Sequence, residues 1–552
     1  MKNLILLFFI LAVNVSSAQQ FSLNNFYGDN TELLRKTDSI YNSLSDTAKV
    51  GQMIITSYGH NGKPREYVES LIKKEKVGGI LYLKGTHQEH LQNTLSLNKL
   101  NQGLPLLYSM DAEPSLMKGR ISTLKGIPKT NAINSIRENE GVAKKISNEL
   151  NSIGVRLNFA PDCDMSTSNA AIGSRSYGNN KDSIISKANS FIKTSSQLGI
   201  VTCAKHFPGH GLVTGDSHHQ RVFIDGELKE LDVYKGMINN PNLISIMIGH
   251  IDIINNQQYN TKGMPSSCSP IIIKKLLQQE LGFRGLVISD ALGMKALNEF
   301  EFPGLEASKA GCDILCMPEN ENKLIIAILE EIQKNQDYAQ QVERSIKKII
   351  RLKLCLGLIH EKPTKKIINY QHAKIIEDQG VNAISNTYGK YEYNQIIDRF
   401  KKEGFEVIGT IREINADSEQ HALRISQQVD SLIIYGYEAK DITLLGASKG
   451  AGITLFASAK LSVNEINIIA LGVCGEWIKE YFEKNKLQLN GRILSIYEAS
   501  DKWNQSCQLI NFGTGITTFK EVKLNTNLKH GFLFTPLDEW VLPALDWIGN
   551  NK

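Results

Sequence analysis

From residue 50 onward, the chain alternates short apolar, β-branched runs with longer amphipathic stretches such as 138–153 and 182–198. The short runs have the length of strands, and the longer stretches repeat their apolar residues at helical spacing. This alternation predicts a parallel sheet with helical crossovers. Eight such units predict an α/β fold of the (β/α)8 TIM-barrel type, with a doubly wound open sheet as the alternative. The predicted strands are 50–57, 77–83, 104–111, 155–162, 200–207, 243–251, 285–292 and 312–317.

A helix over 338–356, with Gly357 as its C-cap, is predicted to close the first domain. After Pro363 a new series of strands and helices begins, so the first domain is predicted to span 19–360 and the second 364–552. The second series again alternates strand and helix, which predicts a small doubly wound sheet. Its predicted strands are 367–370, 407–410, 441–445, 466–471 and 492–497.

The first 18 residues have the pattern of an export signal. Lys2 precedes an apolar run that is too short to span a membrane, and Ser16, Ser17 and Ala18 form a small-residue cleavage site. We therefore expect residues 1–18 to be a signal peptide. The mature chain is then expected to be periplasmic or extracellular, with no stable membrane insertion.

The composition is that of a globular protein, with 41% hydrophobic and 22% charged residues. A net charge of +5 over 552 residues is too dilute for a nucleic-acid partner. The eight cysteines lie far apart, so no disulfide framework is expected. Buried free thiols are expected instead within apolar runs, and the oligomeric state stays open. The cysteines in those runs are Cys203, Cys312, Cys316 and Cys355.

Charged and histidine side chains gather at the ends of the predicted barrel strands. In a TIM barrel the chemistry lies at the carboxyl ends of the strands, and an unpaired charge buried there is costly. Helix caps and loop salt bridges explain one or two such residues but not all of them. The strand-end residues are Asp111, Asp162, Lys205, His206, His250, Asp252 and Asp290.

The most specific motif is KHFPGHG at 205–211, followed after four residues by Asp216-Ser217-His218. Further motifs are NFAPD at 158–162, RSYG at 175–178 and VISDALGM at 287–294. Their order and spacing resemble the β-N-acetylglucosaminidase branch of glycoside hydrolase family 3. The resemblance covers the barrel from roughly Leu44 to Ile359.

The resemblance implies a retaining hydrolase that releases terminal β-linked N-acetylglucosamine, expected from cell-wall or chitin-type fragments. Asp290 would be the nucleophile, and His218, held by Asp216, would be the acid and base. A retaining hydrolase needs one carboxylate at the anomeric carbon and a second group that gives and takes a proton. The glycines at 209, 211 and 215 suggest a mobile loop that delivers His218. The residues implied to hold the sugar are Asp111, Arg175, Lys205 and His206.

Several alternatives stay open for this domain. The histidines at 206, 210, 218 and 219 suggest zinc, but no helical His-Glu-x-x-His pair is present, so neither a metal nor a cofactor is expected. A β-glucosidase-type enzyme, a phosphorolytic enzyme and a sugar-binding protein without turnover are the functional alternatives. Asp111-Ala112-Glu113-Pro114 departs from the family pattern, which leaves Arg120 as a weak candidate partner for Asp111.

In the second domain, the predicted strand 441–445 leads into Gly446-Ala447-Ser448-Lys449-Gly450, and helical sequence follows. This is the G-x-S-x-G turn that exposes a nucleophilic serine, whereas the spacing of a phosphate loop is missing. Asp501 and His530 follow in the order of an α/β-hydrolase triad, and residues 364–552 resemble that superfamily.

Three points stay open in this second site. Glu498 rivals Asp501 as the triad acid. The oxyanion donors would be the Lys449 amide and the His372-Ala373 turn, where the family usually has glycine instead of Ala373. The acyl substrate is not named by any residue, and a non-catalytic structural module is the alternative.

Overall fold

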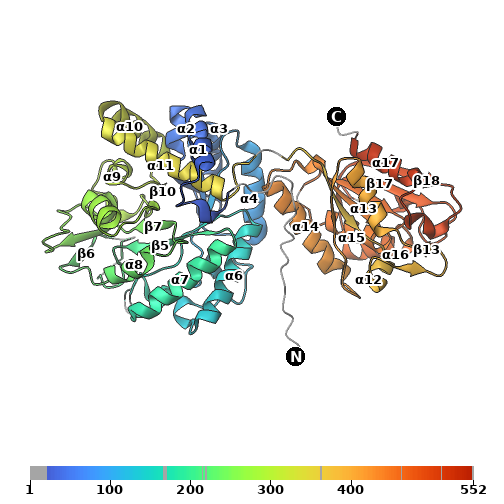
Figure 1. Cartoon of the computed structure of the whole chain (residues 1–552), viewed down its shortest axis with the longest axis horizontal. Coiled ribbons are helices and arrows are strands. Elements are labelled where there is room, and N and C mark those ends of the chain that lie inside the picture. Colours follow the sequence, from blue (N-terminus) through green and yellow to red (C-terminus); the bar gives the residue numbers. More distant parts are fainter. Residues whose placement is uncertain are drawn as a thin grey trace. The chain divides into compact units, whose positions relative to one another are not determined.

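The computed structural model describes residues 21–165, 169, 171–213, 216–217, 220–360, 363–461, 463–510 and 513–549. These residues form two compact units, one up to His360 and the other from Pro363 onward (Figure 1). No helix among the described residues is long and apolar enough to cross a membrane. The proposed signal peptide lies outside the described residues.

The first unit is the predicted barrel. Eight parallel strands follow one another in the order β10-β1-β2-β3-β4-β5-β7-β9. A parallel bridge between Ile288 and Ile314, reinforced by the Ser289 N–H on the Ile314 carbonyl at 2.9 Å, joins the two outer strands. This closes the sheet, so the open-sheet alternative does not apply. The strands are β1 Ile54–Tyr58, β2 Gly79–Tyr82, β3 Leu107–Met110, β4 Leu157–Asn158, β5 Val201–Phe207, β7 Ser245–Ile248, β9 Leu286–Ser289 and β10 Leu315–Cys316.

A helix follows each barrel strand and returns the chain to the next one. Side-chain caps fix several helix starts: Asn180 accepts the Ser183 N–H at the start of α7, and Asn335 accepts the Tyr338 N–H at the start of α11. Gly357, with a φ of +66°, follows the end of α11 as predicted. The helices after successive strands are α3 Arg65–Lys73, α4 His87–Leu100, α6 Ile136–Ser152, α7 Lys181–Gln197, α8 Leu231–Ile238, the π-helix η5 Ile271–Glu280, α9 Pro303–Ala310, and α10 Glu321–Lys334 with α11 Gln336–Cys355.

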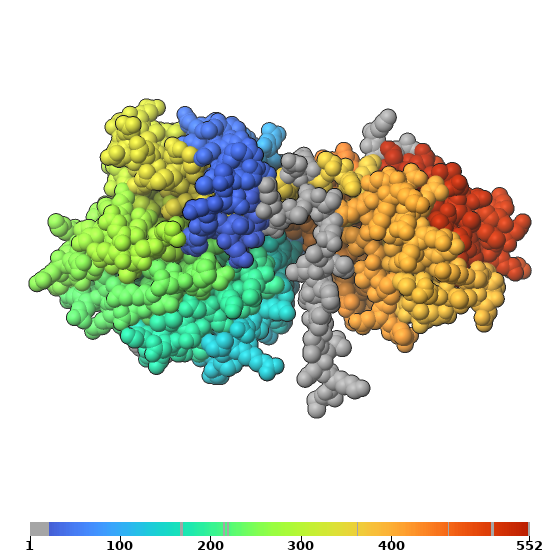
Figure 2. Space-filling view, viewed as in Figure 1, coloured from blue at the N-terminus to red at the C-terminus, as the bar shows by residue number. Residues whose placement is uncertain are grey.

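Helices α1 (Thr31–Ser43) and α2 (Asp46–Gly51) precede the barrel. Figures 1 and 2 show α1 beside α11, where Lys347 pairs with Asp38 at 2.7 Å. The start of the first predicted strand was wrong. The Ser45 side chain accepts the Ala48 N–H and begins α2, so the chain through Val50 is helical and β1 starts only at Ile54.

The predicted strand 243–251 is also two strands rather than one. It breaks at Gly249 and His250 after β7, and β8 (Ile251–Ile254) pairs with β6 (Val222–Asp225) in a separate two-stranded sheet. Asp252 therefore lies outside the barrel strands, where Arg221 binds its carboxylate. Periodicity could not separate the two strands, because both are apolar and only two residues lie between them.

The second unit is a three-layer α/β structure around one sheet. Six parallel strands lie in the order β14-β11-β15-β16-β17-β18. Helices α14 (Ser418–Ile434), α15 (Lys449–Ser458) and α16 (Glu476–Asn485) share one hydrophobic core with the sheet. On its other face lie α12 (Lys374–Gln379), α13 (Tyr393–Lys402) and α17 (Asp538–Gly549). The doubly wound sheet is as predicted. The strands are β11 Ile367–Gln371, β14 Glu406–Gly409, β15 Ile442–Ala447, β16 Asn467–Leu471, β17 Asn490–Glu498 and β18 Gly515–Leu524.

Sequence analysis missed β18, the outermost strand of this sheet. Its burial alternates irregularly and it carries several lysines and threonines, as an exposed edge strand does. A short antiparallel hairpin, β12 (Ile384–Ser385) with β13 (Gly389–Lys390), was missed as well.

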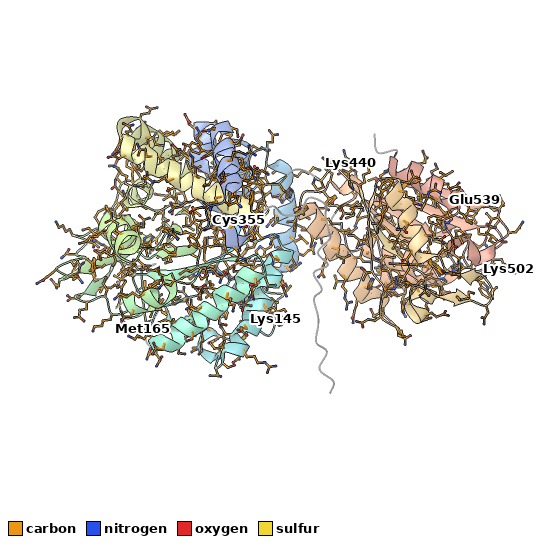
Figure 3. The ribbon with its side chains drawn as sticks, in the orientation of Figure 1. Lys145, Met165, Cys355, Lys440, Lys502 and Glu539 are labelled. Atoms are coloured by element: carbon orange, nitrogen blue, oxygen red, sulfur yellow. A yellow bond between two sulfur atoms is a disulfide. The ribbon has the colours of Figure 1, made fainter. Side chains whose placement is uncertain are left out.

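The cysteine expectation was correct for the barrel and wrong for the second unit. Six free thiols are buried in the first unit, including the four predicted ones; Figure 3 labels Cys355 on α11. Cys474 and Cys507, however, form a disulfide. The two residues are 33 positions apart, and only the fold brings their Cα atoms to 5.0 Å.

We expect Cys474→Ser to lower the free energy of unfolding of the second unit by about 2–4 kcal/mol, because the bridge restricts the unfolded chain. Urea unfolding with and without reductant measures this. The double variant Cys474→Ser/Cys507→Ser should cost no more than either single change, since both break the same bond. A wild-type transition that reductant does not shift would contradict a stabilising bridge.

Candidate active sites

The barrel gathers the strand-end residues of the first unit at one edge. Asp111 follows β3, Asp162 follows β4, Lys205 and His206 belong to the end of β5, and Asp290 follows β9. Because all eight strands are parallel, their carboxyl ends meet at the same mouth. Four strands that are distant in sequence therefore supply one site.

A network of buried charges forms the floor of this site. The Lys205 ammonium binds Asp111 and also lies 2.7 Å from Glu113 Oε1. The Arg175 guanidinium grips the same Glu113 carboxylate with Nε at 2.9 Å and Nη2 at 2.7 Å. Glu113 is fully buried, so two cations compensate one carboxylate that has no access to water. The network fixes the positions of Lys205 and Arg175.

Sequence analysis named Arg120 only as a weak candidate, and the structure places it on Asp111. Its Nη2 lies 2.8 Å from Asp111 Oδ2, and its Nε donates to the Asp111 carbonyl at 3.1 Å. Burial alone would raise the pKa of Asp111, but Lys205 and Arg120 lower it well below its usual range. Asp111 is thus held as a carboxylate.

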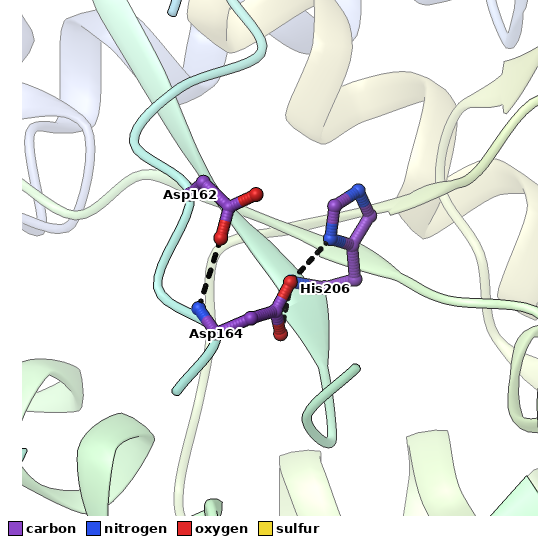
Figure 4. A group of neighbouring side chains, drawn as sticks. All are labelled: Asp162, Asp164 and His206. Atoms are coloured by element: carbon purple, nitrogen blue, oxygen red, sulfur yellow. Dashed lines mark hydrogen bonds and ion pairs between the residues drawn. The ribbon is translucent and has the colours of Figure 1, made fainter. Parts of the chain in front are cut away.

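A second carboxylate, Asp164, orients His206 (Figure 4). Its Oδ2 lies 2.6 Å from His206 Nδ1, and its Oδ1 accepts the His210 N–H at 2.7 Å. Burial alone would lower the pKa of His206, but Asp164 outweighs burial and raises it. His206 Nδ1 is therefore committed to Asp164, which leaves Nε2 as the ring nitrogen for a ligand.

Asp162, Asp164 and His206 also offer three ligand atoms within 4.8 Å of one another. Asp164 spends both oxygens on N–H donors, and Arg175 Nη2 lies 3.3 Å from Asp162 Oδ2. Burial and Asp164 raise the pKa of Asp162 to about 8. Asp164 therefore binds His206, and Asp162 lies against Arg175. That the site needs no metal stays a prediction.

Asp290 differs from this network because its side chain is only half-buried. Its Oδ1 accepts the Ala291 N–H at 2.7 Å. The next carbonyl, that of Ala291, lies 3.0 Å from His250 Nε2, and His250 Nδ1 lies 2.7 Å from Ser267 Oγ. Asp290 makes a smaller contribution than Asp164 to the raised pKa of His206. A held carboxylate with access to the barrel mouth can act as a nucleophile.

Two glycines of the 205–211 motif are required by close packing. A Cβ atom on Gly211 would lie 2.0 Å from the Met165 carbonyl oxygen, and one on Gly209 would lie 2.4 Å from Glu230 Cβ. Glu230 accepts N–H groups from Met165, Gly211 and Leu212. The mobility suggested for this loop stays a prediction.

Gly215 and His218 lie outside the described residues, so the predicted contact between Asp216 and His218 does too. Asp216 itself is described and half-buried. Ser217 Oγ lies 3.0 Å from His210 Nε2, so residues 216–217 contact the 205–211 motif that contains His206.

The second unit brings Ser448, Asp501 and His530 together in a chain of hydrogen bonds. Ser448 Oγ lies 2.9 Å from His530 Nε2, and His530 Nδ1 lies 2.6 Å from Asp501 Oδ2. The three follow β15, β17 and β18, at the carboxyl edge of the sheet. The rival Glu498 instead accepts the Thr526 and Ser500 N–H groups, so Asp501 is the carboxylate on the histidine.

The backbone at Ser448 is strained, and the glycines on either side of it allow neighbouring backbone to pass close by. Ser448 has a φ of +54° and a ψ of −119°, an unusual conformation for a residue other than glycine. A Cβ atom on Gly450 would lie 2.0 Å from the Gln371 carbonyl oxygen, and one on Gly446 would lie 2.5 Å from Ala451 Cα. Both motif glycines are required by close backbone approach.

Glu377 and Arg412, which no sequence motif indicated, connect the two turns of the proposed oxyanion region. Lys449 begins α15, so its N–H has no partner within the helix. The Lys449 ammonium lies 2.7 Å from Glu377 Oε1, and Arg412 Nε lies 3.0 Å from Glu377 Oε2. Arg412 Nη2 also donates to the His372 carbonyl at 2.5 Å. Glu377 therefore connects the Lys449 turn with the His372-Ala373 turn, although nothing adjacent in sequence indicates it.

Comparison with known proteins shows what the first unit is similar to. Residues 46–352 match the glycosyl hydrolase family 3 N-terminal domain. A β-hexosaminidase of Photobacterium profundum is 30% identical over 286 residues, which are 50% of this chain and 83% of that protein. A β-hexosaminidase of Actinobacillus pleuropneumoniae serotype 5b is 28% identical over 346 residues, 59% of this chain and 95% of that protein.

Solved structures share the fold over both units. A family 3 β-N-acetylglucosaminidase from Paenibacillus superposes with a TM-score of 0.53 at 18% identity, covering 92% of this chain and 97% of that one. A β-glucoside phosphorylase superposes with a TM-score of 0.55 at 15% identity, covering 95% and 96%.

Asp164→Asn should lower the pKa of His206, because the amide removes the negative charge that outweighs burial. An NMR titration of the His206 ring measures this change. We also expect kcat/KM on an aryl N-acetylglucosaminide to fall about tenfold or more. Ser217→Ala is the control, since it removes a contact of His210 only and should leave the His206 titration in place. An unchanged titration in Asp164→Asn would contradict the assigned role.

Proposed function

The chain belongs to glycosyl hydrolase family 3 and is a glycosidase of the β-N-acetylhexosaminidase type, and we propose that Asp290 is its nucleophile. The observation that supports this role is the half-buried Asp290 carboxylate, which follows β9 at the barrel mouth and accepts the Ala291 N–H. Attack on the anomeric carbon forms a glycosyl-enzyme as the leaving oxygen departs. Water then releases the sugar with retained configuration.

The remaining residues divide the work of binding and proton transfer. His218, with Asp216, protonates the leaving oxygen and then deprotonates water. Lys205, His206 and Arg175 bind the sugar hydroxyls and the N-acetyl group, together with Asp111. The rigid charge network supports this division, because it presents these groups without rearrangement. The proposed substrate is a terminal β-linked N-acetylglucosaminide, and the proposed location is outside the cytoplasm.

The triad geometry favours a second activity, in which the second unit is a serine hydrolase. Ser448 Oγ attacks an ester carbonyl while His530 Nε2 takes its proton, and Asp501 holds the ring through Nδ1. The proton passes to the departing alcohol, and water then cleaves the acyl-serine. The Lys449 N–H is one proposed donor to the oxyanion. The hydrogen-bonded order Ser448, His530, Asp501 carries this proposal.

Asp290→Ala should reduce hydrolysis of an aryl N-acetylglucosaminide below about one per cent of wild type, a loss of more than ~2.7 kcal/mol of transition-state stabilisation. Steady-state kinetics measure the loss, and NMR of the first product should show the β-anomer. An unchanged urea transition of the barrel serves as the folding control. An α-anomer as first product would exclude the retaining mechanism.

Ser448→Ala should abolish ester hydrolysis and labelling by a fluorophosphonate probe, because it removes the only oxygen that the triad activates. Glycosidase activity should stay within about twofold, since the two sites lie in separate compact units and independent sites behave additively. Ser458→Ala is the matched control, a serine of the same helix whose Oγ donates to the Asn490 carbonyl. If wild type takes no probe and cleaves no ester in a broad panel, the second unit is structural.

A further inference from the structure

Exposed apolar side chains of the second unit gather around the carboxyl edge of its sheet; Trp477 lies in the first turn of α16, Ile384 on β12, and the others in loops. Trp503 is 85% exposed, Ile414 67% and Trp477 51%. Two other large exposed apolar residues described in this unit, Leu423 and Leu542, lie on helices α14 and α17 and are left out of the group. We call the others the apolar rim. The rim consists of Val381, Ile384, Ile411, Ile414, Trp477, Trp503 and Leu528.

Hydrogen bonds and chain connections link the rim loops to the triad. The Trp503 N–H donates to Asp501 Oδ1 at 3.2 Å. Leu528 directly precedes the short helix Lys529–Leu533 that carries His530. The loop of Ile411 and Ile414 includes Ala416, whose carbonyl accepts the Lys449 ammonium at 2.9 Å, next to Ser448. The rim loops therefore border the serine site.

The backbone of Trp503 lies beside the start of α16, which carries Trp477 in its first turn. A Cβ atom on Gly475 would lie 2.6 Å from the Trp503 carbonyl oxygen and 3.5 Å from Trp477 Cδ1. The Cys474–Cys507 disulfide joins the residues just before α16 to the loop that carries Trp503. A Cβ on Gly452, one helical turn after Ser448, would lie 3.7 Å from the tip of the Trp477 ring. The Trp477 ring therefore lies one helical turn from the nucleophile.

The hairpin β12–β13 closes the rim on the histidine side. Ile384 lies on its first strand, and Tyr388 lies in its turn. A Cβ on Gly531 would lie 2.8 Å from the Tyr388 ring, directly beside His530. Tyr388 also packs against Phe534 at 5.4 Å between ring centroids. The Tyr388 ring therefore lies beside the residue that follows His530.

We propose that the apolar rim binds the acyl chain of the ester that Ser448 cleaves, and that this chain is a medium-length hydrocarbon of about six to ten carbons rather than an acetyl group. The inference rests on the proposed serine hydrolase. An acetyl group would leave most of the rim in water, whereas a longer chain covers it and gains from each methylene removed from water. The rim thus sets the substrate class.

The test is kcat/KM for a series of p-nitrophenyl esters from acetate to decanoate, each below its micelle concentration. The leaving group is constant, so ratios within the series report on the acyl chain alone. We expect the octanoate to exceed the acetate at least about thirtyfold, well within the roughly fourfold gain for each fully buried methylene. Trp503→Ala should lower this ratio at least about fivefold and leave the acetate within twofold.

Leu542→Ala, an exposed apolar residue of α17, is the matched control and should not change the ratio. Acetate cleaved at least as well as octanoate, or O-acetylated N-acetylglucosamine preferred over both, would overturn the proposal. A flat series combined with Trp503-dependent binding to phosphatidylcholine vesicles, or with Trp503-dependent dimers, would also overturn it. Failure of every ester and of fluorophosphonate labelling would instead remove the serine hydrolase itself.

Discussion

Parallel strand direction is the constraint on which both sites depend. A parallel sheet brings the carboxyl ends of all its strands to one edge, and each crossover places the next loop beside the last. Asp111 and Asp290 are 179 positions apart and follow strands on opposite sides of the barrel, β3 and β9, yet both lie at the same mouth. Ser448, Asp501 and His530 meet for the same reason at the edge of an open sheet. In each unit, the topology of the sheet, and not closeness in the sequence, brings the polar groups together.

Buried charge is the second common element. Glu113 between Lys205 and Arg175 and Glu377 between Lys449 and Arg412 are both carboxylates with no exposed side-chain surface. Removing Glu377 would leave Lys449 and Arg412 without their shared carboxylate, and removing Glu113 would leave Lys205 and Arg175 with only Asp111 and Asp162. In each unit, one buried acid therefore holds two segments of the site in fixed positions relative to each other.

The sequence predicted the barrel, the second sheet and several of the residues that meet at each edge, because strand ends and turn motifs are local signals, but it wrongly placed Asp252 at the end of a barrel strand. Partners that act across the fold could not be predicted in this way. Glu113 and Asp164 flank recognised motifs but have no distinctive spacing, and Glu377 lies in an ordinary amphipathic helix. Likewise, the pairing of Cys474 with Cys507 depends on two loops that become neighbours only after the sheet forms. The choice of Asp501 over Glu498 required the histidine's position.

The disulfide gives the two units different chemical sensitivities. It ties the loop that carries Asp501 to the end of β16, whereas the barrel's six described free thiols are buried and none bridges a catalytic loop. Reduction would therefore free the loop of Asp501 from the end of β16, whereas the described residues of the barrel have no bridge to lose. Because disulfides persist in oxidising compartments, this tie depends on the redox state of the surroundings.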